Sequence, residues 1–517
     1  MHGIVTPAAA AITGQGITAR QLYDAKTRKG AETADYFVGH ATMDDDPRGA
    51  NGLIVEKSAT SVGAGQKVRF FTREGFYGAG KQEANAFTSA SDFETPVFGQ
   101  YDAQVNCYRH ATSTSEYENE QVALTDLIEQ QIPEMQGAWE GRLRTRLIDL
   151  RIRQMASAES YYVANGKTVN NLISSDILDM NGILSVTGNM MTYGGTPARI
   201  GTVDGQDVFS YVVGPVTQVV TTLKQDSNYQ TLLKGTEMGM RHLLKGSIAT
   251  FGEQAVVPYN VVNHAGVGNI GSARMPMGRL GVAIASGTGS FHMKFHATDT
   301  TTPFTQDFLG YAFPWITGVS GEVVTSDPAI GDTALDDVKY VLVVNPSNPG
   351  GSYVPNATCV YAYTANDGNK LYITGRLKSG GSGAVQSGTG VLTGIDVAAF
   401  DGSNGISVTK YAGYTTATGA TLTDTHPVGA LVYQCNSKGV PLAFTPFYGA
   451  GGILRPLGKK VRQSTMESEE GGFLNKCYHR FYVGTALRRD SLQRTLGVAT
   501  MTHAVKLVHT GVPVVTS

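Results

Sequence analysis

The longest helical pattern in this chain runs from Glu116 to about Asn165. Its large apolar residues recur at steps of three and four, which places them on one broad stripe of a helix with about 3.6 residues per turn. The stripe consists of Leu124, Ile128, Ile132, Met135, Trp139, Leu143, Leu147 and Leu150. A second apolar set, on roughly the opposite side, consists of Ile148, Ile152 and Met155. Because this helix is apolar on two sides, we expect it to lie between two layers of structure.

Proline and arginine residues modify this helix. Pro133 lacks a backbone N–H, so we expect a kink or a new helix start there, with Glu134 in a first turn. Arginine side chains edge the stripe on both sides, and their stems can cover apolar surface while the guanidinium groups stay in water. These arginines are Arg142 and Arg146 on one side, and Arg144 and Arg151 on the other.

Two strand patterns precede the helix. Residues 66–73 (QKVRFFTR) and 97–108 (VFGQYDAQVNCY) alternate polar and apolar positions, which is typical of half-exposed strands. Between them, residues 75–91 are rich in glycine, alanine, serine and charge. The pattern predicts a β-hairpin with a long tip. Since an isolated hairpin is marginally stable in water, we expect this one to rest on another surface.

The rest of the chain divides by composition. The N-terminal residues contain too few large apolar side chains for a core and predict an arm that lies on other surfaces. After residue 325 charge falls, and glycine, serine and threonine separate short β-type runs, which indicates an inserted antiparallel β domain. The predicted segments are an arm (1–52), a hairpin with adjoining strands (53–113), a long helix (114–166), a body of strands and helices (167–325), the inserted β domain (326–441) and a return segment (442–517).

Composition and charge limit the function classes. The 517 residues carry a formal net charge of −2, so the chain lacks the basic character usual for proteins that hold nucleic acid by charge. The four cysteines are far apart and fit no metal-binding spacing, so we interpret them as buried or unreactive thiols. They are Cys107, Cys359, Cys435 and Cys477. No run of 18 apolar residues is present, and the sequence therefore predicts no membrane span.

Three fragments look like chemical motifs but lack the required context. Gly75 to Lys81 opens like a phosphate-binding loop, yet Gln82 stands where serine or threonine would bind magnesium. Gly266 to Gly271 fits a dinucleotide-binding glycine pattern, but no amphipathic helix follows. His292 and His296 are four residues apart, with no third metal ligand indicated. We expect no catalytic residue, no metal ligand and no cofactor.

Two charged groups remain open to interpretation. The acidic run from Asp44 to Asp46, followed by Pro47, lacks the alternating oxygen spacing of a calcium loop and is interpreted as a solvated turn. Basic residues gather in the return segment, where a solvated strand face or salt bridges between subunits is favoured over contact with nucleic acid, because aromatic residues are not interleaved with them. These basic residues are Arg455, Lys459, Lys460, Arg462, Arg480, Arg488, Arg489 and Arg494.

Four runs, together with the order of segments, carry a resemblance to a known family. They are 66–75 (QKVRFFTREG), 101–112 (YDAQVNCYRHAT), 209–235 (FSYVVGPVTQVVTTLKQDSNYQTLLKG) and 243–262, which includes LLKGSIATFGEQAVV. The chain resembles the major capsid proteins of tailed phages with the Hong Kong 97-like fold, and more closely the N4-like phage subfamily.

The resemblance implies an α+β fold. Its parts are an N-terminal arm, an extended hairpin loop at about 65–106, a spine helix of the peripheral domain at about 116–165 and an axial domain at about 167–320. The chain then returns to the peripheral domain within 442–508. Residues 326–441 depart from the minimal family plan and form an insertion domain in this interpretation.

The resemblance also implies a function and partners. Subunits would assemble through hexamers and pentamers into an icosahedral virion shell, formed in the host bacterial cytoplasm around packaged double-stranded DNA. A portal protein and a decoration protein are further expected partners. The sequence shows no long charged helical leader after Met1, which predicts a separate scaffolding protein. The alternative is a glycan- or receptor-binding structural protein that uses residues 326–441.

Residues with expected roles fall into two groups. The core of the long helix is predicted to contain Ile132, Met135, Trp139, Leu143, Leu147 and Leu150. Candidate contacts between subunits are Arg73, Lys81, Arg142, Arg146, Arg488 and Arg489. If residues 326–441 are an insertion, deleting 328–441 with a short linker should spare the folding of the body.

Overall fold

The computed structural model describes a series of stretches of the chain. They are residues 29, 35–37, 41–43, 52–58, 63–73, 98–115, 132–153, 161–173, 175–203, 206–228, 230–231, 249–251, 254–259, 263–264, 270–271, 274, 277–280, 287–288, 292–294, 339–344, 358–367, 370–377, 421–422, 426–427, 429–436, 440–469, 474–488 and 504–512. Helices and strands are both present, and most strand pairs are antiparallel, so the predicted mixed helix and strand content is confirmed.

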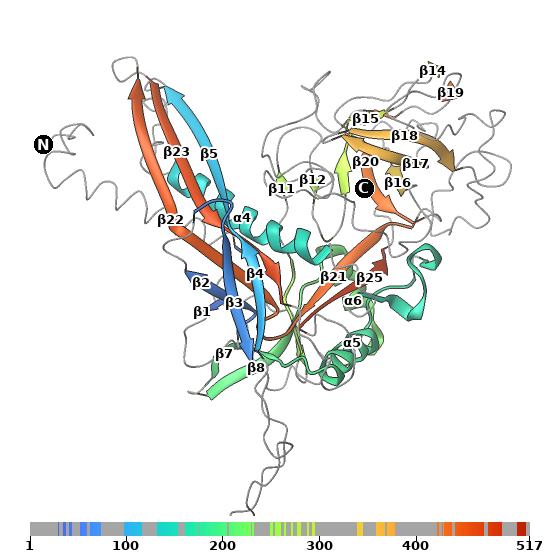
Figure 1. Ribbon diagram of the computed structural model, residues 1–517. Helices are drawn as coiled ribbons and strands as arrows, with labels where there is room; N and C mark the ends of the chain where they lie inside the picture. The colour runs from blue at the N-terminus through green and yellow to red at the C-terminus, as the bar shows by residue number, and fades with distance from the viewer. Residues whose placement is uncertain are drawn as a thin grey trace, which may run out of the picture.

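The first sheet has six strands, in the order β1, β2, β22, β23 and β5, with β24 also paired to β22. Their bounds are β1 Ala41–Met43, β2 Ile54–Ser58, β5 Asn106–Ser115, β22 Ile453–Glu469, β23 Leu474–Val483 and β24 Ala486–Leu487. At 17 residues, β22 is about three times the usual strand length and spans roughly 55 Å. Figure 1 shows β22, β23 and β5 extending together beyond the other strands. These three strands are called the ribbon below.

The second sheet, called the body sheet, has seven strands in the order β6, β25, β21, β8, β10 and β9, with β7 paired to β8. Their bounds are β6 Tyr161–Val163, β7 Ala198–Val203, β8 Gln206–Val213, β9 Ala249–Phe251, β10 Gln254–Val256, β21 Leu442–Tyr448 and β25 Val505–Gly511. Every residue of β21 and β25 is buried. Both faces of β21 and β25 are therefore covered.

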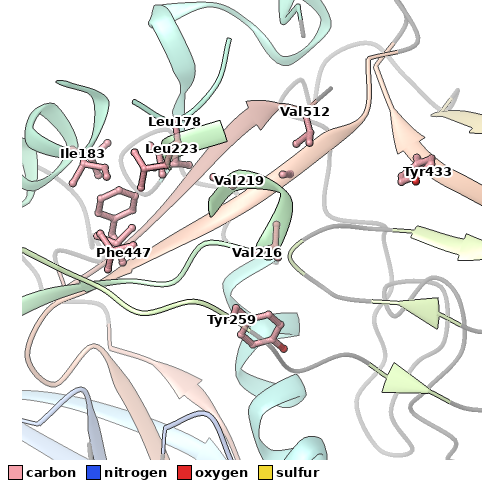
Figure 2. Close-up of a cluster of buried hydrophobic side chains, with 14 of the residues drawn as sticks. Leu178, Ile183, Val216, Val219, Leu223, Tyr259, Tyr433, Phe447 and Val512 are labelled. Atoms are coloured by element: carbon pink, nitrogen blue, oxygen red, sulfur yellow. The ribbon is translucent and has the colours of Figure 1, made fainter. Parts of the chain in front are cut away.

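The helices pack on the body sheet and contribute to the burial of its strands. They are α4 Ile132–Arg153, α5 Met180–Thr192 and α6 Thr217–Gln225, with the short 3-10 turns η3 Ala164–Gly166 and η4 Val169–Asn171. Figure 2 shows Ile183 of α5 and Leu223 of α6 close to Phe447 of β21, within one buried cluster. Asp179 caps α5 by accepting a hydrogen bond from the backbone N–H of Gly182 (2.6 Å).

Helix α4 lies between the two sheets, as its two apolar faces predict. Leu143 and Leu147 pack against Phe481 of the ribbon. Ile148 and Ile152, on the other side, belong to the cluster that includes residues of the body sheet. One helix therefore joins the ribbon to the body.

The third sheet has the order β13, β20, β16, β17, β18 and β15. Its bounds are β13 Met277–Arg279, β15 His292–Lys294, β16 Lys339–Val344, β17 Thr358–Asp367, β18 Lys370–Leu377 and β20 Leu431–Cys435. Three strand pairs complete the described strands: β3 Lys67–Arg73 with β4 Phe98–Gln104, β11 Asn263–His264 with β12 Ile270–Gly271, and β14 Gly287–Thr288 with β19 Thr421–Leu422.

Strand pairing does not follow the predicted segment boundaries. β13 and β15 lie within 167–325 but pair with strands of 326–441. β21 and β25 lie within 442–517 but belong to the body sheet, whereas β22 and β23 form the ribbon. Strands of two or three residues are too short to show alternation, so the sequence could not indicate which sheet they join.

The third sheet shares its core with the body. Leu342, Val344, Tyr433 and Cys435 belong to the same buried cluster as Phe447 of the body sheet. Figure 2 places Tyr433 at one end of this cluster.

A side-chain amide adds a polar link between the same parts. Asn436 Nδ2 donates hydrogen bonds to the carbonyls of Val169 (3.1 Å) and Leu172 (2.9 Å). The shared core and this link argue against the expectation that the body folds unchanged without residues 328–441.

We predict that replacing residues 328–441 by a short glycine-serine linker lowers the thermal unfolding midpoint and increases binding of a hydrophobic dye. The deletion exposes an apolar face of the body, and each large apolar side chain left uncovered costs about 1.5–3 kcal/mol. A shorter deletion, of residues 380–418, removes none of the four shared core residues and serves as the control. A long-deletion variant that melts like the intact chain would contradict this prediction.

Candidate functional site

The described part of α4 begins at Ile132, which puts Pro133 and Glu134 in its first turn. Proline is tolerated there because its missing N–H has no partner within the helix. The described part of the helix runs to Arg153, and Tyr161–Val163 forms strand β6, so the predicted extension of the helix to about Asn165 is wrong. Residues 116–131, which open the predicted pattern, lie outside the described residues.

The predicted core residues of α4 differ in their surroundings. Ile132, Leu143 and Leu147 are buried, and Trp139 is half-buried against the ribbon. Met135 is 63 % exposed, so its prediction as a core residue is wrong. The side chain of Leu150 lies outside the described residues.

Polar side chains lie on the buried side of α4 near Met135, where apolar side chains were expected. Gln136 Nε2 donates to the carbonyl of Cys477 (3.1 Å), and Glu140 is fully buried one turn later. The buried face of α4 is therefore partly polar, which a search for apolar residues could not detect.

A buried ionic cluster, called the ribbon cluster, joins α4 to β23. Glu140 Oε2 lies 2.9 Å from His479 Nε2, and Glu140 Oε1 lies 2.5 Å from Arg144 Nη2. The Arg144 guanidinium also lies 5.7 Å from the ring centre of Phe481. The i,i+4 spacing of Glu140 and Arg144 is visible in the sequence. Their partner His479 could be found only from the fold.

Beside this cluster, His110 of β5 packs on Trp139 with 5.1 Å between ring centres. Burial lowers the pKa of His110, and the neighbouring His479 lowers it further. The folded chain thus favours the neutral form of His110.

We predict that His110 makes the chain less stable as the pH falls from about 6.5, the ordinary histidine pKa. Below that pH the unfolded chain takes up a proton that the folded chain resists, so this contribution to stability is lost. Thermal midpoints between pH 7.5 and pH 5 should fall less steeply for His110→Gln than for the unmodified chain. Equal slopes for the two proteins would contradict the prediction.

A second buried cluster, called the junction cluster, surrounds Arg274. The Arg274 side chain is 2 % exposed. Its Nε donates to Asp149 Oδ1 of α4 (3.0 Å), its Nη1 to the carbonyl of Gly214 (2.9 Å) and its Nη2 to the hydroxyl of Tyr448 (2.8 Å). Tyr259 donates to the other Asp149 oxygen, and its ring lies 3.6 Å below the guanidinium. The Arg274 guanidinium and both oxygens of the Asp149 carboxylate therefore all take part in hydrogen bonds.

The electrostatics of the junction cluster keep Arg274 charged. Burial is the largest single effect and lowers the pKa of the Arg274 guanidinium, but Asp149 and the tyrosines around it, Tyr448, Tyr36 and Tyr259, together outweigh it, so the pKa of Arg274 is raised. Gly214 is required for the close approach, because a Cβ at this position would collide with Arg274 Nη1.

The predicted N-terminal arm contributes three residues to the same region. Phe37 is fully buried in the core that α4 and the body sheet share. The Tyr36 hydroxyl donates to the carbonyl of Val257 (2.8 Å), and its backbone N–H donates to Thr145 Oγ1 of α4 (3.0 Å). These contacts attach the arm to the body at one defined place.

An ion pair strengthens this attachment. Arg455 Nη1 lies 3.1 Å from Asp35 Oδ2 and 3.0 Å from Glu56 Oε1. Arg455 is nearly fully buried, so it does not belong to the predicted solvated face or to a bridge between subunits.

The candidate residues for contacts between subunits differ in their exposure. Arg142 is exposed and Arg488 is half-buried. Arg73 belongs to β3, but its side chain lies outside the described residues, as do Lys81 and Arg489 altogether.

Arg146 is 2 % exposed, so the prediction that its guanidinium stays in water is wrong. Burial lowers its pKa to about 10, and none of its three guanidinium nitrogens has a hydrogen-bond partner in the described part of the chain. The turn of α4 that carries Arg146 packs into the protein interior, which the sequence pattern did not reveal.

We predict that replacing Arg274 lowers the stability of the chain far more than replacing Arg146. Arg274→Met leaves the Asp149 carboxylate buried without its charged partner and should cost about 3–5 kcal/mol. Arg146→Met removes a desolvated charge that makes no hydrogen bond and should change stability by about 1 kcal/mol or less, or increase it. Thermal unfolding of the two variants measures the contrast. A larger loss for Arg146→Met than for Arg274→Met would refute it.

Within the described residues, no group of three or more histidine, cysteine, aspartate or glutamate side chains could hold a metal ion. The described helices include none with the length and apolar character of a membrane span.

Comparisons with known proteins return structures but no sequence family. No family model matches the chain, and no curated protein matches it. The capsid of Ralstonia phage GP4 is similar with a TM-score of 0.47 and 10 % identity, over 93 % of this chain and 92 % of that chain. The acidic stable capsid structure of Helicobacter pylori bacteriophage KHP30 is similar with a TM-score of 0.46 and 11 % identity, over 92 % and 91 %. The cyanophage Pam1 capsid asymmetric unit gives 0.45 and 8 %, over 93 % and 92 %. TM-scores below 0.5 do not establish a shared fold.

Proposed function

We propose that this chain is the major capsid protein of a tailed double-stranded DNA bacteriophage, with a Hong Kong 97-like fold of the N4-like type. In this proposal the subunits assemble through hexamers and pentamers into the icosahedral shell around the genome. The role is structural, and no catalytic residue is assigned.

The observation that carries the proposal is the ribbon. Strand β22 spans roughly 55 Å, and in Figure 1 the ribbon runs well past α4, away from the body. Such an extension adds little to the core of its own subunit, but it can reach a neighbour. The separate β3–β4 pair adds a second elongated element, with Phe71 63 % exposed beside the ion pair of Arg69 and Asp102.

The order of elements supports the same proposal. The attachment at residues 35–37, the β3–β4 pair, the long helix α4, the body strands β6 to β10 and the ribbon strands β22 and β23 follow one another in the order that the sequence resemblance implies. The ribbon strand β5 lies before α4, and the body strand β25 comes last. We accordingly assign 1–52 to the arm, 53–113 to the extended loop, 114–166 to the spine helix and 442–517 to the return. We also assign 167–325 to the axial domain and 326–441 to an insertion that shares strands and core with it.

The overall charge suits a container for DNA. Affinity for the phosphate backbone rises with the number of phosphates neutralised, and a chain of net charge −2 does not hold its contents tightly. Contacts between subunits can each be weak, because many act together in a closed shell. The proposed partners are further copies of this chain, a separate scaffolding protein, a portal protein and a decoration protein.

A glycan- or receptor-binding protein that uses residues 326–441 is the second candidate. The core that this segment shares with the body makes it less suited to be an independent binding module.

We predict that the purified chain, expressed with its genomic neighbours, forms closed shells tens of nanometres across or hexamer and pentamer rings. Negative-stain electron microscopy with light-scattering mass tests this directly. Leu143→Asp places an unpaired charge in the core and should abolish folding and assembly together. A chain that stays a monodisperse monomer, both when expressed alone and when expressed with its genomic neighbours, would falsify the proposal. Glycan binding would then be the function to test.

A further inference from the structure

Strand β5 forms an edge of the first sheet that lacks most of the protections usual for such strands. It pairs with β23 residue for residue from Asn106 to Ser115, and no other strand in the described part of the chain pairs with it. A long edge strand can pair with another chain, so natural proteins shorten edge strands, bend them with a bulge, or place charge or proline on them. β5 is ten residues long and regular, it contains no lysine or proline, and Arg109 is its one permanently charged residue.

Other edges of the three larger sheets are protected. β1, β6, β9, β13 and β15 each end a sheet and are only three residues long. β24 has two residues, and β7 is interrupted by a register shift after Arg199. The outer part of β22, residues 462–469, contains an arginine and two glutamates. By comparison β5 is long, regular and almost uncharged, so we expect its edge to be covered when the chain associates.

The middle of β5 is accessible, and its exposed positions are evenly spaced. Figure 1 shows β5 running with the ribbon away from the body. The side chains of Arg109, Ala111 and Ser113 are exposed and alternate with half-buried neighbours. Between them, His110 lies on the other face, against Trp139 of α4. The exposed positions are thus centred on Ala111, the smallest side chain of the strand, which permits the close approach of a second backbone.

We propose that β5 of one subunit pairs with β5 of a second copy of this chain, antiparallel and about a two-fold axis at Ala111. In this register Ala111 opposes Ala111, and Arg109 of each copy opposes Ser113 of the other, so that no like charges meet. The ribbon strands of the two copies then continue into one another as a single sheet. A two-fold contact uses the same patch on both copies and closes the edge of each. This contact rests on the proposed self-assembly, and it specifies one interface within it.

Two charge substitutions at Ser113 in the full chain test the register. Ser113→Lys places a lysine opposite Arg109 of the second copy, whereas Ser113→Glu places a glutamate there. Because each contact contains this pair twice, the dissociation constant of the dimer should rise about three- to tenfold for Ser113→Lys and fall by a similar factor for Ser113→Glu. Sedimentation equilibrium of the unassembled chain at low salt measures both constants. Equal constants for the two variants, or no dimer with either of them, would overturn the proposal.

Matched controls separate the contact from general effects of charge. Thr221 is exposed on α6, outside the ribbon, so Thr221→Lys and Thr221→Glu should leave the dissociation constant unchanged. The thermal midpoints of the Ser113 variants should stay within a few degrees of the unmodified chain, because the Ser113 side chain is exposed. Combining Ser113→Lys with Arg109→Glu should restore the dimer, and a combination that does not restore it contradicts the register.

Cross-linking separates this inference from the proposed function. Ala111→Cys puts two thiols opposite each other on the axis, with Cβ atoms about 4.5–5.5 Å apart, near the separation that a disulfide needs. Oxidation with diamide should join two copies through this cysteine, and should not join them through Thr221→Cys. Shells that form without the Ala111→Cys cross-link would overturn the inference and keep the proposed function. Cross-linked dimers that form no shells with the genomic neighbours would do the reverse.

A strand of another protein is the competing occupant of this edge. Mass spectrometry of the cross-linked peptides, from the chain expressed with its genomic neighbours, identifies the partner of Ala111→Cys. A peptide joined to the same peptide of a second copy supports the pairing. A peptide joined to a genomic neighbour, or to another cysteine of this chain, overturns it.

Discussion

The buried guanidinium of Arg274 makes the contacts on which the arrangement of the chain depends. It binds Asp149 of α4, the carbonyl of Gly214 at the end of β8 and the hydroxyl of Tyr448 in β21. Its Cζ also lies 4.7 Å from the ring centre of Tyr36 in the N-terminal segment. Removing such a charge from water is costly unless every hydrogen bond is made. The cluster is therefore stable only when helix, sheet and N-terminal segment are all in place, which favours one arrangement of the chain over others.

Helix α4 carries this constraint to the ribbon. On one side Asp149 joins the helix to the junction cluster, and on the other Glu140 joins it to His479 of β23. Apolar contacts of Leu143 and Ile148 accompany the two ionic links, one on each side. The helix consequently fixes the direction of the ribbon relative to the body. In the proposed assembly, an extended element that contacts neighbouring copies needs a defined direction.

The third sheet and the N-terminal segment are attached to the body in different ways. The sheet shares an apolar cluster with the body and adds the Asn436 link to Val169 and Leu172. The N-terminal segment is held by few residues, with Phe37 in the core and Asp35 paired to Arg455. A broad apolar contact makes the sheet an integral part of the body. A second attachment of the same segment is β1, which pairs with β2 in the first sheet.

The sequence by itself determined the local elements with strong periodicity. The alternation in 66–73 predicted β3, and the two apolar faces of the long helix predicted its place between two layers, because side-chain periodicity depends only on local backbone geometry. The tertiary structure alone decided which residues meet across long separations. Examples are Glu140 with His479, 339 residues apart, and Asp149 with Arg274, 125 apart. It also turned Met135 outward and Arg146 inward, because the buried face of α4 is selected by the layers that cover it, and hydrogen-bonded polar groups can fill that face as well as apolar ones.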